Sequence, residues 1–370
     1  MDELEATMLI DTDVHESWTM DDVKPYLSPF WRDLLERWAG EGFAMSHNPW
    51  LVPIEHGTRK EWREGHPTKG YPSTDRGTLQ RQLFEEEGVS IGILNGSGNE
   101  FSAIQQSPEF VAALASAYND WQIDYWLEPE PRLRGSVSVM MHDPEQAAAE
   151  IDRVGGHPQI VQVILKTITD VQFGDPRYRP IFEAALRNDL AVTMHHCTAT
   201  QTVIGMPRYY VDWHTTAAPF SNICQLSNMI FNGVFDRYPD LKVVILETGV
   251  AWLPWFMWRA DEQYRGHRAE VPWLKRLPSE HMRDNVRVAT QPLNDINAKQ
   301  FVQIVELADA ERVFVFASDY PHYDADTAAA VLPRTLPEEL RRRIRYQNAV
   351  ETFPKLRGLV DEAGERGSGG

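Results

Sequence analysis

Some features are scarce or absent in this sequence of 370 residues, and each absence argues against one class of protein. Two cysteines, Cys197 and Cys224, indicate neither a disulfide framework nor a thiolate metal site. No window is long and apolar enough to span a membrane, and no basic-then-apolar leader opens the chain. Lys and Arg number 36 against 54 Asp and Glu, and this net charge of −18 argues against nucleic acid, whose phosphates need clustered cations. We therefore expect a soluble cytoplasmic protein with a small-molecule substrate.

A glycine-rich phosphate loop is also missing after the first predicted strand, and this absence argues against a doubly wound sheet that binds a dinucleotide. Strand–helix alternation instead favours an α/β fold, a (β/α)8 TIM barrel. The eight predicted strands cover Met8–His15, Val89–Asn95, Leu133–Met141, Ile160–Thr167, Leu190–His196, Leu241–Thr248, Asn285–Gln291 and Arg312–Ser318. The predicted helices cover Ser107–Leu127, Asp143–Glu150, Pro180–Asn188, Ser221–Phe235, Trp252–Arg265, Asn297–Leu307 and Pro337–Glu351.

Residues 16–78 repeat no strand pattern and are rich in tryptophan, glycine and proline. Long insertions after a barrel strand are usually functional, so we predict a lid or wall over the site. Residues 1–360 would then form a single barrel domain, and residues 361–370 a disordered tail.

The last predicted strand carries the clearest chemical signal, in the stretch from Phe314 to His322. Side chains alternate between the two faces of a strand, so Val313, Val315, Ala317 and Asp319 share one face and the bulky Phe314 and Phe316 the other. A barrel strand has this pattern when its large residues pack on outer helices and its tip carries chemistry. The alternative is that Asp319 only caps the next helix.

The first predicted strand ends in a matching pair. By alternation, Met8, Ile10 and Val14 share one face, and Leu9, Asp11, Asp13 and His15 share the other. Asp13-x-His15 therefore predicts two ligands that point the same way, although a solvated edge strand would also carry such a pair. A closed barrel makes its first and last strands neighbours, which would bring Asp13 and His15 next to Asp319.

Three further strands end in polar groups. In the fifth, the apolar alternation predicts that His195 points inward, so we prefer it to His196 as a ligand, the alternative being that both are structural. Lys166 ends the fourth strand and Glu247 the sixth; either could be an ordinary surface or paired charge. Charges at this many strand ends nevertheless match the usual place of a barrel active site.

These donors are imidazoles and carboxylates without sulfur, which suits Zn²⁺, Mn²⁺ or Fe²⁺. We predict a divalent metal ion held by Asp13, His15, His195 and Asp319. Such an ion lowers the pKa of bound water and polarises a carbonyl, and Asp319 or Glu247 could carry the proton.

At this point the residues resemble a known family. Nearly the whole chain is similar to the amidohydrolase superfamily, in the branch containing aminocarboxymuconate-semialdehyde decarboxylase and resorcylate decarboxylases. The motifs that carry the resemblance are Ile10-Asp-Thr-Asp-Val-His15, Ala117-Tyr-Asn-Asp-Trp121, Leu190-Ala-Val-Thr-Met-His195, Tyr238-Pro-Asp-Leu-Lys-Val-Val-Ile-Leu-Glu247 with Trp252-Leu-Pro254, Ser318-Asp-Tyr-Pro-His322 and Gln347-Asn-Ala349. The resemblance implies a distorted barrel, a divalent metal, often a homodimer, and Asp13, His15, His195 and Asp319 as ligands.

The sequence departs from the well-studied decarboxylases at two of these positions. They carry histidine where this chain has Asp13, and a catalytic histidine at the end of strand six, where this chain has Glu247. Glu247 could be a general base or a ligand to a second metal ion. Binuclear superfamily members carry a carboxylated lysine on strand four, where Lys166 lies, so the resemblance also makes Lys166 a candidate ligand.

We therefore favour metal-dependent hydrolysis of an ester, amide, thioester or lactone bond. His214 or His322 could orient the substrate, although His214 may be read as structural and His322 as support for Asp319. The first alternative is metal-dependent, non-oxidative decarboxylation of a small or aromatic carboxylic acid. The second is an inactive barrel that acts as a binding protein.

Overall fold

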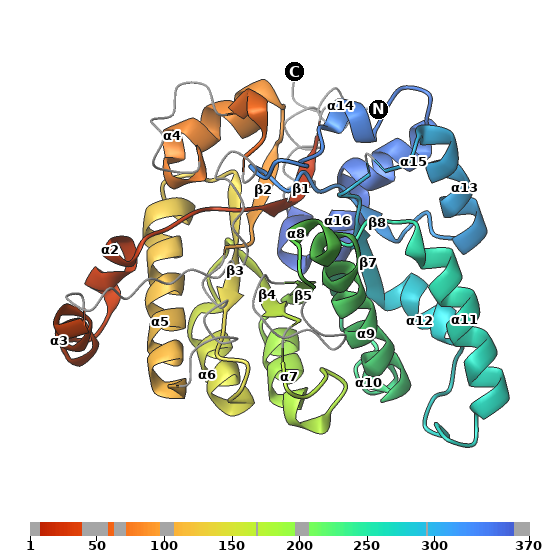
Figure 1. The fold of residues 1–370 in the computed structure, drawn as a ribbon, viewed down its shortest axis with the longest axis horizontal. Helices are drawn as coiled ribbons and strands as arrows, with labels where there is room; N and C mark the ends of the chain where they lie inside the picture. The colour runs from red at the N-terminus through yellow and green to blue at the C-terminus, as the bar shows by residue number, and fades with distance from the viewer. Residues whose placement is uncertain are drawn as a thin grey trace.

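The protein forms a barrel of eight parallel strands, arranged in the order β1 to β8 and surrounded by helices (Figure 1). The computed structural model describes residues 8–38, 58–62, 72–96, 107–167, 169–196, 207–293 and 295–358. The last strand meets the first through a parallel bridge between Val14 and Tyr320. The His15 amide donates to the Tyr320 carbonyl at 2.7 Å, and the Asp319 amide to the Asp13 carbonyl at 3.0 Å. The predicted (β/α)8 barrel is confirmed.

The strands are shorter than the sequence predicts. They are β1 Ile10–Val14, β2 Ile91–Leu94, β3 Leu133–Ser138, β4 Ile160–Lys166, β5 Ala191–His195, β6 Val243–Ile245, β7 Val286–Ala289 and β8 Phe314–Val315. β3, β6 and β8 each end three residues before the predicted end, and Glu247 and Asp319, which follow β6 and β8, adopt φ values of 48° and 62°. This left-handed backbone cannot continue a strand, so neither acidic residue belongs to the strand that precedes it.

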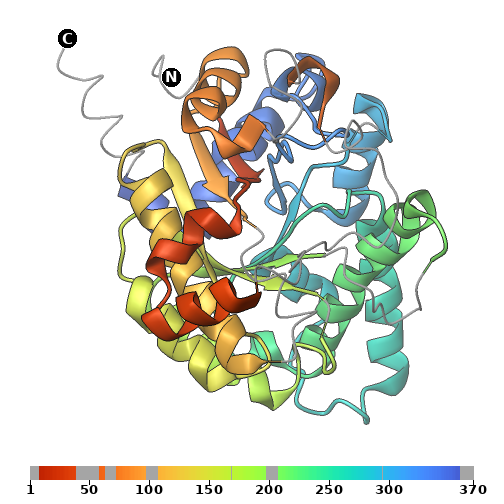
Figure 2. The same ribbon diagram turned by 60° about the vertical axis from the view of Figure 1, so that its left-hand side comes forward.

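Helices follow the strands and cover the outside of the barrel (Figure 2). They are α2 Met20–Val23, α3 Pro29–Trp38, α4 Arg76–Leu79, α5 Pro108–Trp121, α6 Pro144–Val154, α7 Arg179–Arg187, α8 Tyr210–Asp212, α9 Ala218–Phe231, α10 Val234–Arg237, α11 Trp252–His267, α12 Pro278–Asn285, α13 Ala298–Ala308, α14 Ala328–Val331, α15 Glu338–Arg342 and α16 Asn348–Thr352. Caps set several of the starts: Ser107 accepts from the Phe110 amide, and Asp143 from the Gln146 amide.

The packing confirms the alternation predicted for the fifth strand and, from Phe314 to Ala317, for the eighth. Val313, which was predicted to share the face of Val315, lies in the outer core instead. Val192 and Met194 lie in the large outer core with Phe314 and Phe316. Ala191, Val315 and Ala317 lie in a second core, together with Phe353, which follows α16. The small side chains of β5 and β8 therefore face the barrel interior.

The alternation predicted for the first strand is wrong. Ile10 lies in the inner core, whereas Val14 lies in the outer one. The pairing of β1 with β2 is irregular between Asp11 and Val14, and this shift breaks the two-residue period. The position of Asp13 in the site therefore depends on this register shift, which a regular two-residue alternation does not predict.

The described part of the predicted insertion packs in two places. Figure 1 shows α2 and α3 beside α5, on the flank of the barrel, where the rings of Trp31 and Phe110 lie 5.3 Å apart. Trp62 instead packs against Tyr320, in the segment that follows β8, with ring centroids 4.7 Å apart. Residues 39–57 and 63–71, and the predicted tail at 361–370, lie outside the described residues. Among the residues described, no helix is long and apolar enough to cross a membrane.

Candidate metal centre and active site

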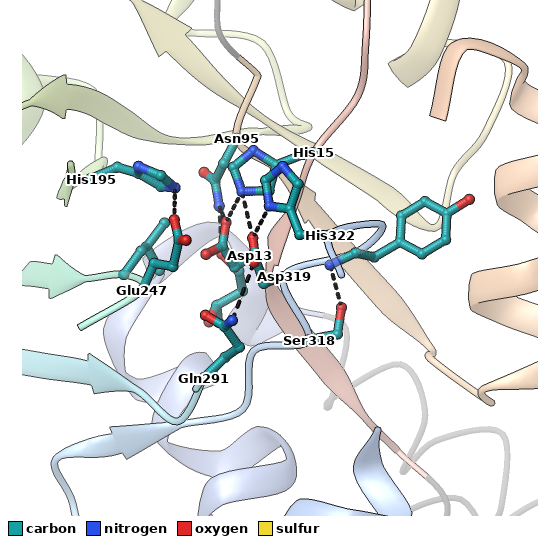
Figure 3. Close-up of polar contacts among 12 residues, drawn as sticks. Asp13, His15, Asn95, His195, Glu247, Gln291, Ser318, Asp319 and His322 are labelled. Atoms are coloured by element: carbon teal, nitrogen blue, oxygen red, sulfur yellow. Dashed lines mark hydrogen bonds and ion pairs between the residues drawn. The ribbon is translucent and has the colours of Figure 1, made fainter. Parts of the chain in front are cut away.

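The four predicted metal ligands converge at the carboxyl ends of β1, β5 and β8 (Figure 3). His15 Nε2 lies 3.1 Å from Asp13 Oδ1 and 2.9 Å from Asp319 Oδ1. The rings of His15 and His195 are 5.1 Å apart, and donor atoms of Asp13, His15 and His195 lie within 4.8 Å of one another. Residues about 300 positions apart thus share one site because the barrel closes.

Both carboxylates are completely buried and held by amide side chains. Asn95 donates to Asp13 Oδ1 at 3.0 Å, and Gln291 donates to Asp319 Oδ2 at 3.2 Å (Figure 3). Gln162 donates to Asn95 at 2.5 Å, which extends this network across the barrel interior to β4. Such outer hydrogen bonds fix the direction of a ligand oxygen.

The two histidines of this group differ in protonation. His195 Nδ1 lies 2.5 Å from the carbonyl of His196; a carbonyl only accepts, so Nδ1 donates and Nε2 keeps its lone pair. Burial and the neighbouring Lys166 hold the pKa of His195 well below its usual value. Burial alone would lower the pKa of His15 too, but Asp13 and Asp319 raise it well above the usual value.

Glu247 lies across from this group, among three histidines. Its Oε2 is 3.3 Å from His195 Nε2 and 2.9 Å from His196 Nε2, and its Oε1 is 3.2 Å from His214 Nε2. Asp324, after β8, approaches the same His214 nitrogen at 3.7 Å. Although burial opposes it, the imidazoles hold the pKa of Glu247 well below the usual range. Glu247 is therefore ionised at neutral pH.

The pKa values of His214 and Asp324, on this side of the site, are both shifted upward. Burial would lower the pKa of His214, but its bond to Glu247 and the charge of Asp324 raise it to about 9. Burial, with the charges of Asp319 and Glu247, raises the pKa of Asp324 to about 7. In the absence of a cation, His214 therefore carries a proton between two acids.

A divalent cation fits the first group of residues. Asp13 Oδ2 and His195 Nε2 are buried atoms that make no hydrogen bond among the described residues. Leaving such atoms without a partner is costly, and a cation would satisfy both. The carboxylate and imidazole donors match the preferences of manganese, iron and zinc.

The structure brings the other predicted residues to the same end of the barrel. His322 Nδ1 lies 2.7 Å from Asp319 Oδ1, and Lys166 is fully buried on β4, in register with His195 on β5. Three residues of the site were not predicted: Asn95, Gln291 and Asp324. Asn95 and Gln291 end predicted strands, which is a usable signal, whereas Asp324 lies in a loop and has none.

A family model described as Amidohydrolase matches residues 10–355. The chain belongs to the amidohydrolase family.

Relatives within this family extend the comparison. The chain is 24% identical to a gamma-resorcylate decarboxylase of a Polaromonas species over 314 residues, which cover 78% of this chain and 91% of the relative. The crystal structure of 5-carboxyvanillate decarboxylase from Sphingomonas paucimobilis aligns with a TM-score of 0.68 at 20% identity, covering 94% of this chain and 99% of that one. Dihydroxybenzoic acid decarboxylase of Polaromonas, solved with manganese and 2-nitroresorcinol, aligns with a TM-score of 0.67 at 19% identity, covering 95% and 98%. Both solved structures share the fold.

The preference for hydrolysis is corrected by this comparison, because these relatives are decarboxylases. The sequence argument rested on Glu247 in the place of a strand-six histidine. In the structure, imidazoles of His196 and His214 lie beside Glu247 nonetheless. The missing histidine therefore does not leave this side of the site without an imidazole.

Proposed function

We propose that the protein is a metal-dependent, non-oxidative decarboxylase of a small, unsaturated or aromatic carboxylic acid. The cluster of Asp13, His15, His195 and Asp319 at the barrel mouth carries this proposal, together with the decarboxylase relatives. The proposed reaction breaks the bond between the carboxylate and a carbon atom. The electron pair stays on that carbon, carbon dioxide leaves, and a proton replaces it.

Asp13, His15, His195 and Asp319 would hold a divalent cation. When bound, this cation supplies positive charge for the oxygens of an anionic substrate. Manganese, zinc and iron all suit this donor set, and Lys166 and Glu247 stay predicted as further ligands.

The proton is assigned to the pair formed by His322 and Asp319. His322 Nδ1 donates to Asp319 Oδ1 at 2.7 Å. Although burial opposes it, the charge of Asp319 raises the pKa of His322 above its usual value, which favours the protonated imidazole. The His322 side chain is 34% exposed, whereas Asp319 is fully buried. His322 is thus the partner that solvent or substrate reaches first.

Aromatic side chains lie beside the polar groups on the Glu247 side of the site. Tyr210 stacks on His214 at 5.5 Å, and Tyr323 lies 6.0 Å from the same ring. Tyr323 is 42% exposed and so offers a free aromatic surface. Offset contact with a planar substrate would favour an aromatic or conjugated acid.

The proposal is tested by supplying manganese-loaded protein with hydroxylated benzoates and unsaturated dicarboxylates in deuterated water. We expect carbon dioxide release that requires manganese, with one deuterium at the carbon that lost the carboxylate. Manganese-loaded protein that releases no carbon dioxide from any of these acids would contradict the proposal. The role of residues 16–78 as a lid and the homodimer remain predictions.

A further inference from the structure

His322, the proposed proton donor, lies in the loop after β8, and the backbone on either side directs its ring. The ring bonds to Asp319 through Nδ1, and the His322 side chain is 34% exposed. Within the loop, the His322 amide donates to the Asp319 carbonyl at 2.9 Å, and the Ala325 amide donates to the His322 carbonyl at 3.2 Å. A partly exposed ring can turn away from a substrate unless this backbone is held, so the groups that hold it matter for proton transfer.

Tyr320, two residues before His322, joins this loop to the segments that precede β2. Its side chain is fully buried, and its hydroxyl donates to Gln82 Oε1 at 2.7 Å. Gln82 lies in the π-helical segment Gln80–Glu86 after α4, and its Nε2 donates to the Trp62 carbonyl at 3.2 Å. The Trp62 ring in turn packs on the Tyr320 ring, with centroids 4.7 Å apart. The three buried residues therefore form a closed set of contacts against the loop.

The directions of these bonds fix the orientation of the Gln82 amide. A backbone carbonyl only accepts, so the side-chain nitrogen of Gln82 faces Trp62, and its oxygen is left to accept from Tyr320. Gln82 is only 2% exposed, so removing the hydroxyl would leave its oxygen without a partner and away from water, which is costly. The bond between Tyr320 and Gln82 is therefore specific, and general packing would not replace it.

Residues 58–62 hold the loop at two further points. The Arg59 amide donates to the Pro321 carbonyl at 3.0 Å, and Arg59 Nη1 lies 3.5 Å from the Ala325 carbonyl. Pro321 directly precedes His322 and Ala325 follows it, so these contacts flank the imidazole in the chain. The segment thus supports the loop on both sides of the proton donor.

We propose that Tyr320, Gln82 and Trp62 are positioning residues for His322. They hold the backbone of the loop, and the loop aims the imidazole. The inference rests on the proposed decarboxylation and goes beyond it by naming what keeps its proton donor in place. A misplacement of about 1 Å can lower a rate by about 10²-fold, so support behind the loop should influence kcat. The competing account is that the three residues only stabilise the fold.

Hydrogen–deuterium exchange measures this support without any substrate. Manganese-loaded, full-length protein is compared with Tyr320→Phe and Gln82→Leu, through peptides that cover residues 318–326. We expect the His322 and Ala325 amides to exchange at least about tenfold faster in both variants, because the loop opens more often.

Tyr264→Phe is the matched control for the lost hydroxyl. Tyr264 is a buried tyrosine of α11 whose hydroxyl donates to the Leu274 carbonyl at 3.0 Å, and its variant should leave exchange of the loop unchanged. Unchanged loop exchange in both Tyr320→Phe and Gln82→Leu would overturn the proposal. An equal rise over the whole chain would also overturn it, because the residues would then only stabilise the fold.

A double-mutant cycle on kcat tests whether Tyr320 acts through His322. We expect Tyr320→Phe to retain manganese and to lower kcat for carbon dioxide release by about tenfold, with KM within about threefold of the wild type. In the His322→Gln background, the same change should lower kcat no further, because the group that Tyr320 positions is gone.

Three results of this cycle would overturn the proposal: loss of manganese in Tyr320→Phe, an unchanged kcat in that variant, or a further fall of about tenfold in the His322→Gln background. Wild-type protein that releases no carbon dioxide would instead contradict the proposed decarboxylation. In that case, faster exchange in Tyr320→Phe would still show that Tyr320 holds the loop.

Discussion

The two sides of the candidate site are built differently. On one side, Asp13 in β1 accepts at its carbonyl from the amide of Asp319, which follows β8, and amide side chains of Asn95 and Gln291 hold their carboxylate oxygens. On the other, Glu247 meets His214 from a neighbouring segment at 3.2 Å and His196 at 2.9 Å. The first side is braced by the barrel itself. The second depends on side chains that a bound ion or substrate would complete.

The largest effect should follow from breaking the braced side. Asp319→Asn removes the charge of a predicted ligand and the partner of His322, so we expect carbon dioxide release to fall by more than about 10²-fold, with loss of tightly bound manganese. Activity and metal content are measured together. Asp326→Asn, a buried acid on the same loop, should retain both. An active Asp319→Asn variant would break the assignment of this side.

A separate loss is expected when the proton donor alone is removed. His322→Gln should lower kcat by about 10²-fold or more, in the range of general acid catalysis, while the first cation stays bound. The matched control is His281→Gln. His281 is a buried histidine in α12, before β7, and it is paired with Asp236 rather than with a residue of the site. If His322→Gln and His281→Gln had equal kcat values, His322 would have no role in proton transfer.

Supporting amides provide a direct comparison between the two sides. Asn95 donates to Asp13, whereas Asn222 donates to the Leu246 carbonyl and Thr248 next to Glu247. We expect Asn95→Ser to weaken binding of the first manganese ion by about 10- to 100-fold, the usual effect of a lost outer hydrogen bond. Asn222→Ser should leave that affinity within about threefold, since its contacts lie on the other side. Titration of metal-free protein measures both, and equal losses would show that the two sides are not separable.

The smallest effect concerns the scaffold away from the site. Burial would raise the pKa of Glu130, but its bonds to Arg132 and Gln80 lower it to about 2. Because the pKa of Glu130 is lowered on folding, its carboxylate stabilises the folded state at pH values above 4.5, the ordinary pKa. This contribution is lost as the pH falls from 4.5 toward 2. Glu130→Gln should therefore cost about 1 kcal/mol at pH 7, because Arg132 is partly solvated, and progressively less below pH 4.5. Urea unfolding at several pH values measures this; a cost that stays constant down to pH 2 would contradict the pairing.

The contrast between the two sides also explains what the sequence could predict. Period-two alternation identified the inward residues of β5, and hence His195, because that strand is regular. Asp319 was also placed correctly, although it lies beyond the end of β8 in left-handed backbone that the alternation does not describe. Asp13 was also predicted to lie in the site, but from a regular two-residue alternation. The pairing of β1 is irregular between Asp11 and Val14, so the prediction was correct although its argument was not. The preference for His195 left no role for His196, which points at Glu247 in the structure.

Loop residues escape this kind of prediction. Asp324 approaches His214 only because the loop after β8 turns toward the segment after β5, and neither loop has a periodic pattern. The positive φ values of Glu247 and Asp319 could not be predicted from the sequence either, since neither residue is a glycine. Tertiary packing holds both acids in this strained conformation at the site.

The central claim is that one cation is held by Asp13, His15, His195 and Asp319, on the braced side of the site. Anomalous diffraction at the manganese edge from crystals grown with manganese tests it most directly. We expect a strong peak at coordination distance from donor atoms of all four residues. A manganese peak bound only by other residues, or no peak within the barrel mouth, would contradict it.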